Sequence, residues 1–333
     1  MNEFICGADI GWATQLESMG YYWTDDAGNK KDILEILKGY GTNAIRFRLF
    51  VNPPATSWWQ KNENENVMLG FCDTNSVIEA SKRVVKAGMK LMLDFHYSDV
   101  FADPQHQHIP AAWEGHSVTE LINDVREYTL CTLRAFKDNE ITPDWIQVGN
   151  EINPGMMLPV GDSTKAMEVL VSFLNAGYEA VKEVFPDTAV ITHLASGGCV
   201  NEITTWFDRF FECGGKTDII GLSHYPYWNK ITPNMEFTDL GNNMLLYYKK
   251  YAKPIMVVEV GEDESEWEEC YRLITKTILD LKAIPDNNGL GVFYWEPDVG
   301  RDVLKDGYPL GASQYIGEKD IRFTRALSAF CLK

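Results

Sequence analysis

Short apolar runs alternate with segments of helical periodicity along this 333-residue sequence. The expected strands are residues 4–10, 43–49, 90–96, 145–151, 189–194, 219–224, 255–260 and 291–296. Between them apolar side chains recur at helical spacing, as from Val77 through Ala80 and Val84. The expected helices are residues 32–40, 77–88, 118–137, 167–181, 201–213, 240–251, 266–282 and 320–332. This alternation predicts a parallel sheet covered by helices.

The number of strand-then-helix units selects an architecture. Eight such units in a chain of this length are typical of a (β/α)₈ TIM barrel, with a doubly wound open sheet as the alternative. No low-complexity stretch or linker rich in Pro, Gly and Ser divides the sequence. We therefore predict an α/β protein with a single catalytic (β/α)₈ barrel domain over residues 1–333.

Polar side chains gather at the carboxyl ends of the expected strands, where barrel enzymes build their sites. They are Arg46, Arg48, Asp94, His96, Asn150, Glu151, His193, Ser223, His224, Tyr225, Glu259, Trp295 and Glu296. The amino ends of the same strands carry no such accumulation. A functional site is therefore expected at one end of the barrel.

Two acids in this set, Glu151 and Glu259, each close an apolar run. A carboxylate there is unfavourable unless it has a task, and paired carboxylates are the equipment of glycoside hydrolysis. Asn150 could hold a sugar hydroxyl beside the reacting carbon, so Glu151 is predicted to be the acid/base and Glu259 the nucleophile. Strands four and seven lie across the barrel from each other, and we predict that the reaction retains anomeric configuration. The alternative for either glutamate is a buried ion pair with Arg46.

The chain is acidic, with a formal net charge of −18. Nucleic acid and other polyanions are not expected as partners, because phosphate contacts need clustered Lys and Arg, and a neutral substrate fits better. No apolar run reaches the roughly 18 residues of a membrane span. The amino terminus has no basic segment followed by a long apolar one, so no signal peptide is visible.

Cysteine and histidine spacing gives no sign of a metal or a cofactor. Seven scattered cysteines form no Cys-x-x-Cys pair, and most are expected to be buried thiols. His106 and His108 lack a third ligand at zinc spacing. Phosphate-loop and Gly-x-Ser-x-Gly motifs are absent from the sequence as well. We predict no metal and no cofactor.

Several sequence phrases occur together over nearly the whole chain. They are Gly7-Ala-Asp-Ile10, Ile45-Arg46-Phe-Arg48, Leu93-Asp94-Phe-His96-Tyr-Ser-Asp99, Ala102-Asp103-Pro104, Val148-Gly-Asn-Glu151, Tyr225-Pro-Tyr227, Val257-Val-Glu259 and Tyr294-Trp295-Glu-Pro297. With these phrases the sequence resembles glycoside hydrolase family 53, the endo-β-1,4-galactanases of a large clan of retaining barrel enzymes. The stretch from Ser98 to Pro104, with Gln107, Pro110 and Trp113 after it, is the most particular to that family.

The resemblance implies roles for individual residues. Glu151 matches the family's acid/base and Glu259 its nucleophile, while Tyr225 matches the residue that hydrogen-bonds the nucleophile and Trp295 the aromatic floor under the central sugar. The other substrate-binding residues that we expect are Arg46, His96, Asp99, Asn150, His193 and His224. Aromatic side chains expected to line outer sugar subsites are Trp12, Trp23, Trp58, Trp59, Phe101, Trp113, Tyr227 and Trp228, of which about half are expected to be core or loop anchors instead.

Three departures from the family pattern concern the predicted site. Phe101 stands where relatives commonly have Trp, and Ala195-Ser-Gly-Gly198 replaces an acidic pair. The segment after Glu259 is short where some relatives carry a calcium-binding excursion, so no such calcium site is expected.

Two other functions remain open from the residues. One is another endo-glycanase of the same clan, acting on mannan or β-glucan, and the other is a glycan-binding barrel without catalysis. The resemblance favours a monomeric enzyme that acts on neutral β-galactan, a plant cell-wall polysaccharide. It also implies an extracellular, cell-surface or periplasmic location.

Overall fold

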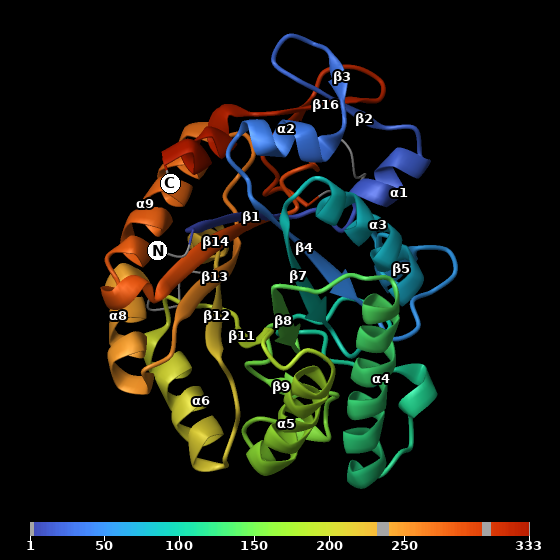
Figure 1. Ribbon diagram of the computed structural model, residues 1–333, viewed down its shortest axis with the longest axis vertical. Coiled ribbons are helices and arrows are strands. Elements are labelled where there is room, and N and C mark those ends of the chain that lie inside the picture. The colour runs from blue at the N-terminus through green and yellow to red at the C-terminus, as the bar shows by residue number, and fades with distance from the viewer. Residues whose placement is uncertain (1–2, 232–239, 302–307, 333) are drawn as a thin grey trace.

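The computed structural model describes residues 3–231, 240–301 and 308–332 and shows a closed barrel of eight parallel strands surrounded by helices (Figure 1). In chain order the barrel strands are β1 (Ile5–Asp9), β4 (Ala44–Leu49), β7 (Lys90–Phe95), β8 (Trp145–Val148), β11 (Ala189–Leu194), β12 (Ile219–His224), β13 (Ile255–Val260) and β14 (Gly289–Trp295). β1 pairs with both β4 and β14, which closes the sheet. The predicted TIM barrel is confirmed, and the open doubly wound sheet is excluded.

The helices follow the strands as the periodicity predicts. They are α1 (Ala13–Ser18), α2 (Ile33–Gly39), α3 (Thr74–Lys86), α4 (Val118–Asp138), α5 (Met167–Val184), α6 (Val200–Glu212), α7 (Pro226–Ile231), α8 (Leu240–Tyr251) and α9 (Trp267–Lys282), with short 3₁₀ helices η1 (Ala111–Trp113), η2 (Pro285–Asn287) and η3 (Arg325–Leu332). Local capping fixes several starts. Asp73 accepts from two amides at the start of α3, and Ser117 and Glu120 form a capping box on α4.

Alternation along the strands divides the barrel interior into two layers. Side chains near the amino ends form an apolar plug, which contains Ile5, Ala44, Met92, Ile191, Ile219, Met256, Val258 and Phe293. Further along the same strands the inward positions are polar, as at Asp9, Arg46 and Asp94, and all three side chains are buried. Because side chains alternate with a period of two, strands β1, β4 and β7 contribute Ile5, Ala44 and Met92 to the plug and Asp9, Arg46 and Asp94 to this polar layer.

Strand β13 carries a β-bulge that departs from this alternation. Along β12, Leu222 and Ser223 are adjacent, whereas their neighbours on β13 are Val257 and Glu259. The shift leaves Val258 as an extra residue in β13. Val258 belongs to the apolar plug, and the bulge lets Glu259 face inward as well.

Elements outside the barrel were not predicted. A hairpin of β5 (Trp58–Asn62) and β6 (Glu65–Met68) follows β4, and β9 (Gly155–Met156) pairs with β10 (Gly161–Asp162) after β8. A four-stranded sheet joins β15 (Ser313–Tyr315), β16 (Asp320–Phe323), β2 (Tyr22–Thr24) and β3 (Lys30–Lys31). The predicted helix over 320–332 is therefore wrong in its first part, where Ile321 and Phe323 alternate with partly exposed residues as a half-buried strand requires.

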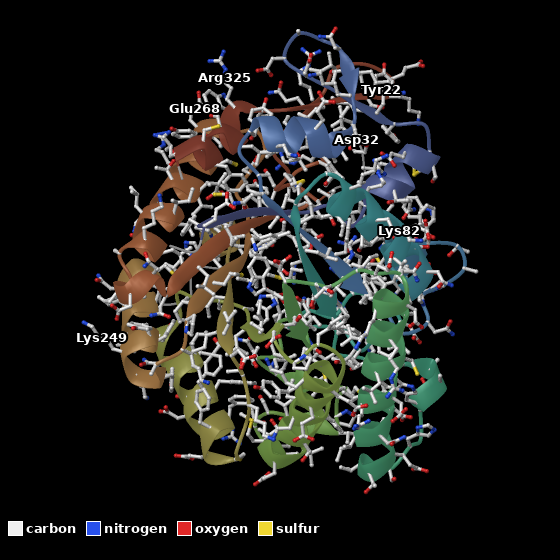
Figure 2. All side chains as sticks on the ribbon, viewed as in Figure 1. Tyr22, Asp32, Lys82, Lys249, Glu268 and Arg325 are labelled. Atoms are coloured by element: carbon white, nitrogen blue, oxygen red, sulfur yellow. The ribbon has the colours of Figure 1, made fainter. Side chains whose placement is uncertain are left out.

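Charged side chains cover the outside of the molecule. Lys249, Glu268 and Arg325 lie at the periphery of the ribbon in Figure 2. All seven cysteines are free, and Cys6, Cys72 and Cys270 are buried. The other four are half-buried or exposed, so the expectation that most cysteines are buried is wrong. Among the described residues, no helix is long and apolar enough to cross a membrane.

Candidate active site

A cavity of about 1310 Å³ opens at the carboxyl end of the barrel. Its wall comes mainly from the segments that follow the strands, which is where TIM-barrel sites form. The predicted site residues that line it are His96, Asn150, Glu151, Tyr225, Glu259 and Trp295. The two predicted catalytic glutamates therefore face one shared space.

Arg46 lies beneath this cavity and connects several strand ends. Its Nη1 donates to Asp9 Oδ2 and to Glu259 Oε1, both at 3.0 Å. Its Nη2 donates to Asp94 Oδ2 at 2.7 Å and to Asn150 Oδ1 at 2.9 Å. The guanidinium is fully buried, so it organises the floor and has no open face toward a sugar. The buried ion pair considered as an alternative is present for Glu259, and it coexists with a place in the cavity wall.

Both carboxylate oxygens of Glu259 have donors. Arg46 donates to Oε1, and the hydroxyl of Tyr225 donates to Oε2 at 2.8 Å. Burial raises the pKa of Glu259 to about 7, against the opposing charge of Arg46 and the hydrogen bond from Tyr225. These two donors stabilise the ionised form, which is the form that a nucleophile needs.

Glu151 lies at the end of β8 in a left-handed backbone conformation, with φ at 47°. The Gln107 side chain supports this turn, because its Nε2 donates to the carbonyl of Asn150 at 2.8 Å. Burial raises the pKa of Glu151 well above its ordinary value, and the nearby charge of Glu259 adds to the rise. When the two carboxyls share one proton, it resides on Glu151, since Arg46 favours the ionised form of Glu259.

His96 and Asn150 are joined through one backbone unit. The amide of Ala102 donates to His96 Nδ1 at 2.9 Å, and the carbonyl of Ala102 accepts from Asn150 Nδ2 at 2.8 Å. His96 Nδ1 is therefore an acceptor, and Nε2 carries the hydrogen that reaches Asp94 Oδ2 at 2.9 Å. Both side chains enter the cavity wall in a fixed orientation.

Gln147 and Asp9 belong to the polar layer, although neither was predicted from the sequence as a site residue. Gln147 Oε1 accepts from Arg46 at 3.2 Å, and its Nε2 donates to Asp94 and to the carbonyl of Gly149. Asp9 receives Arg46 on one oxygen and Arg48 on the other. The alternation of inward and outward side chains could have identified them, because Trp145 and Gln147 lie on the same face of β8.

Besides Arg46, three predicted sugar contacts do not line the cavity. Asp99 accepts from the backbone amides of Asn52 at 3.0 Å and Ala111 at 2.8 Å, so it ties two loops together. His193 is fully buried below the cavity. His224 has the opposite parity to the inward Ser223, so it faces the surrounding helices. Burial lowers the pKa of His224 to about 4, with a further contribution from the positive charge of Lys276.

Aromatic rings form one side of the cavity. Trp12, Phe101, Trp295 and Tyr308 pack edge to face on one another, with ring centroids 4.5 to 6.2 Å apart. The guanidinium of Arg48 lies 4.7 Å from the Phe101 ring.

The outer aromatic residues divide between the cavity and the core. Trp58, Trp59 and Trp228 also line the cavity, and Trp58 and Trp228 are exposed. Trp23 and Trp113 are buried core residues instead.

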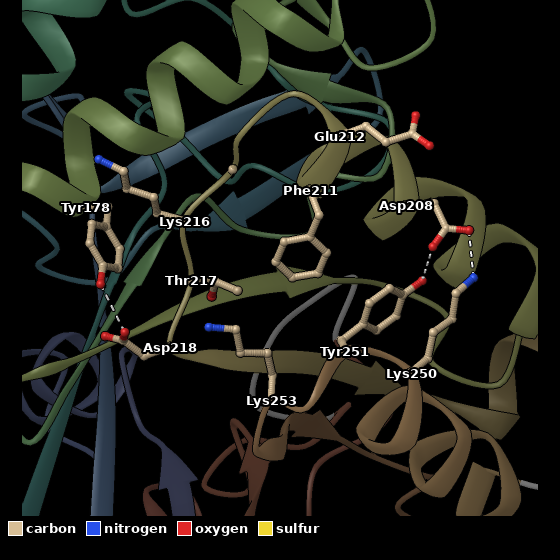
Figure 3. Close-up of a pocket in the computed structure, with 11 residues that line it drawn as sticks. Tyr178, Asp208, Phe211, Glu212, Lys216, Thr217, Asp218, Lys250, Tyr251 and Lys253 are labelled. Atoms are coloured by element: carbon tan, nitrogen blue, oxygen red, sulfur yellow. Dashed lines mark hydrogen bonds and ion pairs between the residues drawn. The ribbon is translucent and has the colours of Figure 1, made fainter.

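A second hollow, of about 760 Å³, lies near the amino ends of β12 and β13 (Figure 3). Its charged groups form separate pairs. Lys250 contacts Asp208 at 2.6 Å, and the hydroxyl of Tyr178 donates to Asp218 at 3.0 Å. Lys216 pairs with Glu179 outside the hollow at 2.7 Å. These groups do not converge on one point, and none of the predicted site residues lies here.

Metal ligands are not clustered in the part of the chain that the structure describes, where no group of three His, Cys, Asp or Glu side chains could hold an ion. His106 instead contacts the carboxylate of Asp103 at 2.8 Å, and its ring packs against Trp59. The expectation that the protein needs no metal stays a prediction.

Comparison with known proteins places this geometry in context. The model of glycosyl hydrolase family 53 matches residues 5–270. An uncharacterized protein of Niallia circulans is 33% identical over 324 residues, covering 88% of this chain and 83% of its own length. An arabinogalactan endo-beta-1,4-galactanase of Cellvibrio japonicus is 30% identical over 329 residues, with coverage of 88% and 80%. The solved catalytic domain of an Ignisphaera aggregans family 53 protein superimposes with a TM-score of 0.85 at 27% identity, covering 99% of this chain and 96% of that one.

Proposed function

The chain belongs to glycosyl hydrolase family 53, and on that basis we propose that it is a retaining endo-β-1,4-galactanase with Glu151 as acid/base and Glu259 as nucleophile. The observation that carries the assignment is the asymmetry of the pair. Arg46 and Tyr225 donate to the two oxygens of Glu259, whereas burial and the charge of Glu259 hold a proton on Glu151. Double displacement needs this combination of an ionised nucleophile and a neutral acid.

In the first step Glu259 attacks the anomeric carbon while Glu151 transfers its proton to the glycosidic oxygen. The bond between carbon and leaving oxygen breaks, and a covalent ester forms between the sugar and Glu259. Arg46 remains paired with Asp9 and Asp94 as the charge on Glu259 is consumed, so its guanidinium is not left without a partner. Tyr225 keeps the attacking carboxylate in its orientation.

In the second step Glu151, now ionised, takes a proton from water. The resulting hydroxide equivalent attacks the same carbon from the face that the leaving group vacated, and the bond to Glu259 breaks. Two displacements at one carbon restore the original anomeric configuration. The enzyme returns to its starting state with a proton on Glu151.

A neutral β-1,4-galactan is the proposed substrate. The relative from Cellvibrio japonicus is named for this activity. The aromatic side of the cavity, with Trp12, Phe101 and Trp295, offers ring faces on which the C–H face of a sugar can stack. The net charge of −18 also favours an uncharged polymer over an anionic one.

We also propose a monomer that acts outside the cytoplasm on plant cell-wall galactan, with residues 1–333 as one catalytic domain. Similarity to an arabinogalactan endo-beta-1,4-galactanase supports the substrate, and the location is the one that the family resemblance implies. Size-exclusion chromatography with light scattering tests the oligomeric state, and secretion of the native full-length protein tests the location.

Release of reducing sugar from a panel of neutral polysaccharides tests the function. We expect release from β-1,4-galactan and none from mannan or β-glucan, with Glu259→Ala as the inactive control. Proton NMR of the first products should show the β-anomer before mutarotation. Release from mannan or glucan alone would identify another activity of the clan, binding without release would identify a non-catalytic barrel, and an initial α-anomer would contradict retention.

A further inference from the structure

Gln107 is a buried residue on the loop that follows β7, and it has no part in the steps above. Its Nε2 lies 2.8 Å from the carbonyl oxygen of Asn150, 3.2 Å from that of Asp103 and 3.4 Å from that of Glu151. Carbonyl oxygens only accept, so this end of the side-chain amide is the nitrogen, and it donates. Gln107 therefore holds the backbone immediately before and after the α-carbon of Glu151.

The backbone that Gln107 holds makes a tight turn at the end of β8. φ is 81° at Gly149 and 47° at Glu151. Glycine adopts such an angle freely, whereas a glutamate keeps it only when its surroundings enforce it. The amide of Gly149 still donates to β7 at 3.0 Å, and the amide of Ile152 donates to β11 at 3.2 Å. Between these two barrel contacts, the turn is held at its carbonyls by Gln107.

The loop that carries Gln107 has a fixed shape of its own. Asp103 and His106 exchange backbone hydrogen bonds at 3.1 and 3.0 Å, and the carboxylate of Asp103 accepts from the amide of Gln105 at 2.7 Å. The carbonyl of Gln107 accepts from the amide of Leu158, also at 2.7 Å. Because its own backbone is held on both sides, Gln107 can hold a strained turn in place.

The other polar groups at this end of the barrel are less dependent on Gln107. The side chain of Asn150 has hydrogen-bond partners on two other elements. Both carboxylate oxygens of Glu259 have donors. Glu151, in contrast, is hydrogen-bonded to Gln107 through its backbone carbonyl. Loss of Gln107 should therefore disturb the predicted acid and leave the predicted nucleophile in place.

We propose that Gln107 is a positioning residue for the acid/base, because the turn that it holds keeps the carboxyl of Glu151 directed toward the glycosidic oxygen. Gln107 does not belong to the lining of the cavity, whereas Glu151 and Glu259 do. It therefore acts through Glu151 and not by contact with a sugar. This inference rests on the proposed function, because it assigns a purpose to the proton of Glu151.

The test compares two substrates whose leaving groups differ in their need for a proton. For Gln107→Met, kcat/KM on β-1,4-galactan should fall by about 10²-fold, the cost of misplacing a catalytic group by about 1 Å. On an aryl β-galactobioside the leaving group is a strongly acidic phenol, which departs without protonation, so kcat/KM should stay within a factor of about three. An equal loss on both substrates, or no loss on galactan, would overturn the proposal.

Two further variants control the comparison. Gln15 is another buried glutamine, on α1, and its side chain accepts from the amide of Gly70 at 2.7 Å. Any effect of Gln15→Met should be the same on both substrates. Gln107→Asn keeps the amide but is too short to reach the same carbonyls, so it should show the selective loss on galactan. It takes the place of Gln107→Met if that variant does not fold.

A second measurement needs no activity and separates this inference from the proposed function. Infrared titration in the Glu259→Gln background removes the coupling between the two acids. Burial raises the pKa of Glu151, so a carboxyl that turns away toward water should titrate at lower pH. The carboxyl band that disappears with Glu151→Gln should show this shift when Gln107→Met is added. The remaining ionisable groups that face Glu151 are kept in both proteins and are Asp103, Arg46 and Tyr225.

The two measurements assign a failure to one proposal or the other. If galactan is not cleaved by the wild type but the infrared shift is found, the proposed function fails and the positioning of Glu151 by Gln107 stands. If galactan is cleaved with retention and Gln107→Met affects both substrates equally or leaves the band unmoved, only the role of Gln107 is wrong.

Discussion

The two ends of the barrel use the same residue types in opposite ways. At the carboxyl end, Arg46 is buried and shared among Asp9, Asp94 and Glu259. At the amino-end hollow, Lys250 pairs with Asp208, and both side chains are substantially exposed. The pKa of Asp208 is lowered, first by its hydrogen bond from Lys250, whereas burial raises the pKa of Glu259 to about 7.

Desolvation and sharing explain the difference between the ends. An exposed one-to-one pair stabilises the ionised acid and contributes little to stability. In the buried polar layer, several carboxyls compete for two guanidinium groups, so some of them retain a proton at neutral pH. A hollow alone therefore does not mark a site, and titratable groups that share buried partners do.

The largest expected effect is at the nucleophile. Glu259→Ala should reduce kcat/KM on galactan by about 10⁴-fold or more, because no covalent intermediate can form. Lys250→Ala in the amino-end hollow is the matched control and should leave the rate within a factor of about two. Initial rates of reducing-sugar release measure both variants. A mild loss for Glu259→Ala would show that the contrast between the two ends has no catalytic meaning.

Removal of the acid should discriminate between substrates. Glu151→Ala should lose about 10² to 10⁴-fold on galactan, where the leaving sugar needs a proton. In an aryl β-galactobioside the leaving group is a strongly acidic phenol, which departs without protonation. The first step on this substrate should therefore be largely spared in Glu151→Ala. Stopped-flow release of the phenol measures that step. An equal loss on both substrates would remove Glu151 from the acid role.

Stability should depend on pH at the buried end. The pKa of Glu259 is about 7 in the folded protein and near 4.5 when unfolded, so ionisation opposes folding as pH rises through that window. Glu259→Gln removes this penalty. The substitution should therefore raise the unfolding free energy at pH 8 by about 2 kcal/mol more than it does at pH 5. Urea unfolding at the two pH values checks it. A gain of the same size at both would mean that Glu259 is not desolvated as described.

The smallest effect is expected at the amino-end pair. Asp208→Asn should change the unfolding free energy by less than about 1 kcal/mol, because the partners are exposed and screened by salt. The change should shrink further in 1 M NaCl. Urea unfolding at low and high salt measures this, and a loss comparable with that of a buried group would erase the distinction between the two ends.

The barrel itself was predictable because each strand is a short apolar run followed by an amphipathic helix. The catalytic candidates were predictable for a related reason, since Glu151 and Glu259 interrupt such runs. Gln147 was harder to assign, because its place in the polar layer depends on which parity faces inward. That parity also separates Ser223 from its neighbour His224, which does not line the cavity.

Elements outside the barrel were less predictable. The β5–β6 hairpin, which supplies Trp58 and Trp59 to the cavity, is too polar and irregular to be recognised by periodicity. The strand from Asp320 to Phe323 exists because β2 provides its partner more than 290 residues earlier, and local pattern contains no such information.

The bulge in β13 gives this strand two consecutive inward side chains, Val258 and Glu259. In a regular strand neighbouring side chains face opposite ways, so only one of these two could point into the barrel. The extra residue therefore lets a single strand fill the apolar plug and also place an acid in the wall of the cavity. Both tasks depend on one irregular backbone position, although the rest of the strand is buried and apolar.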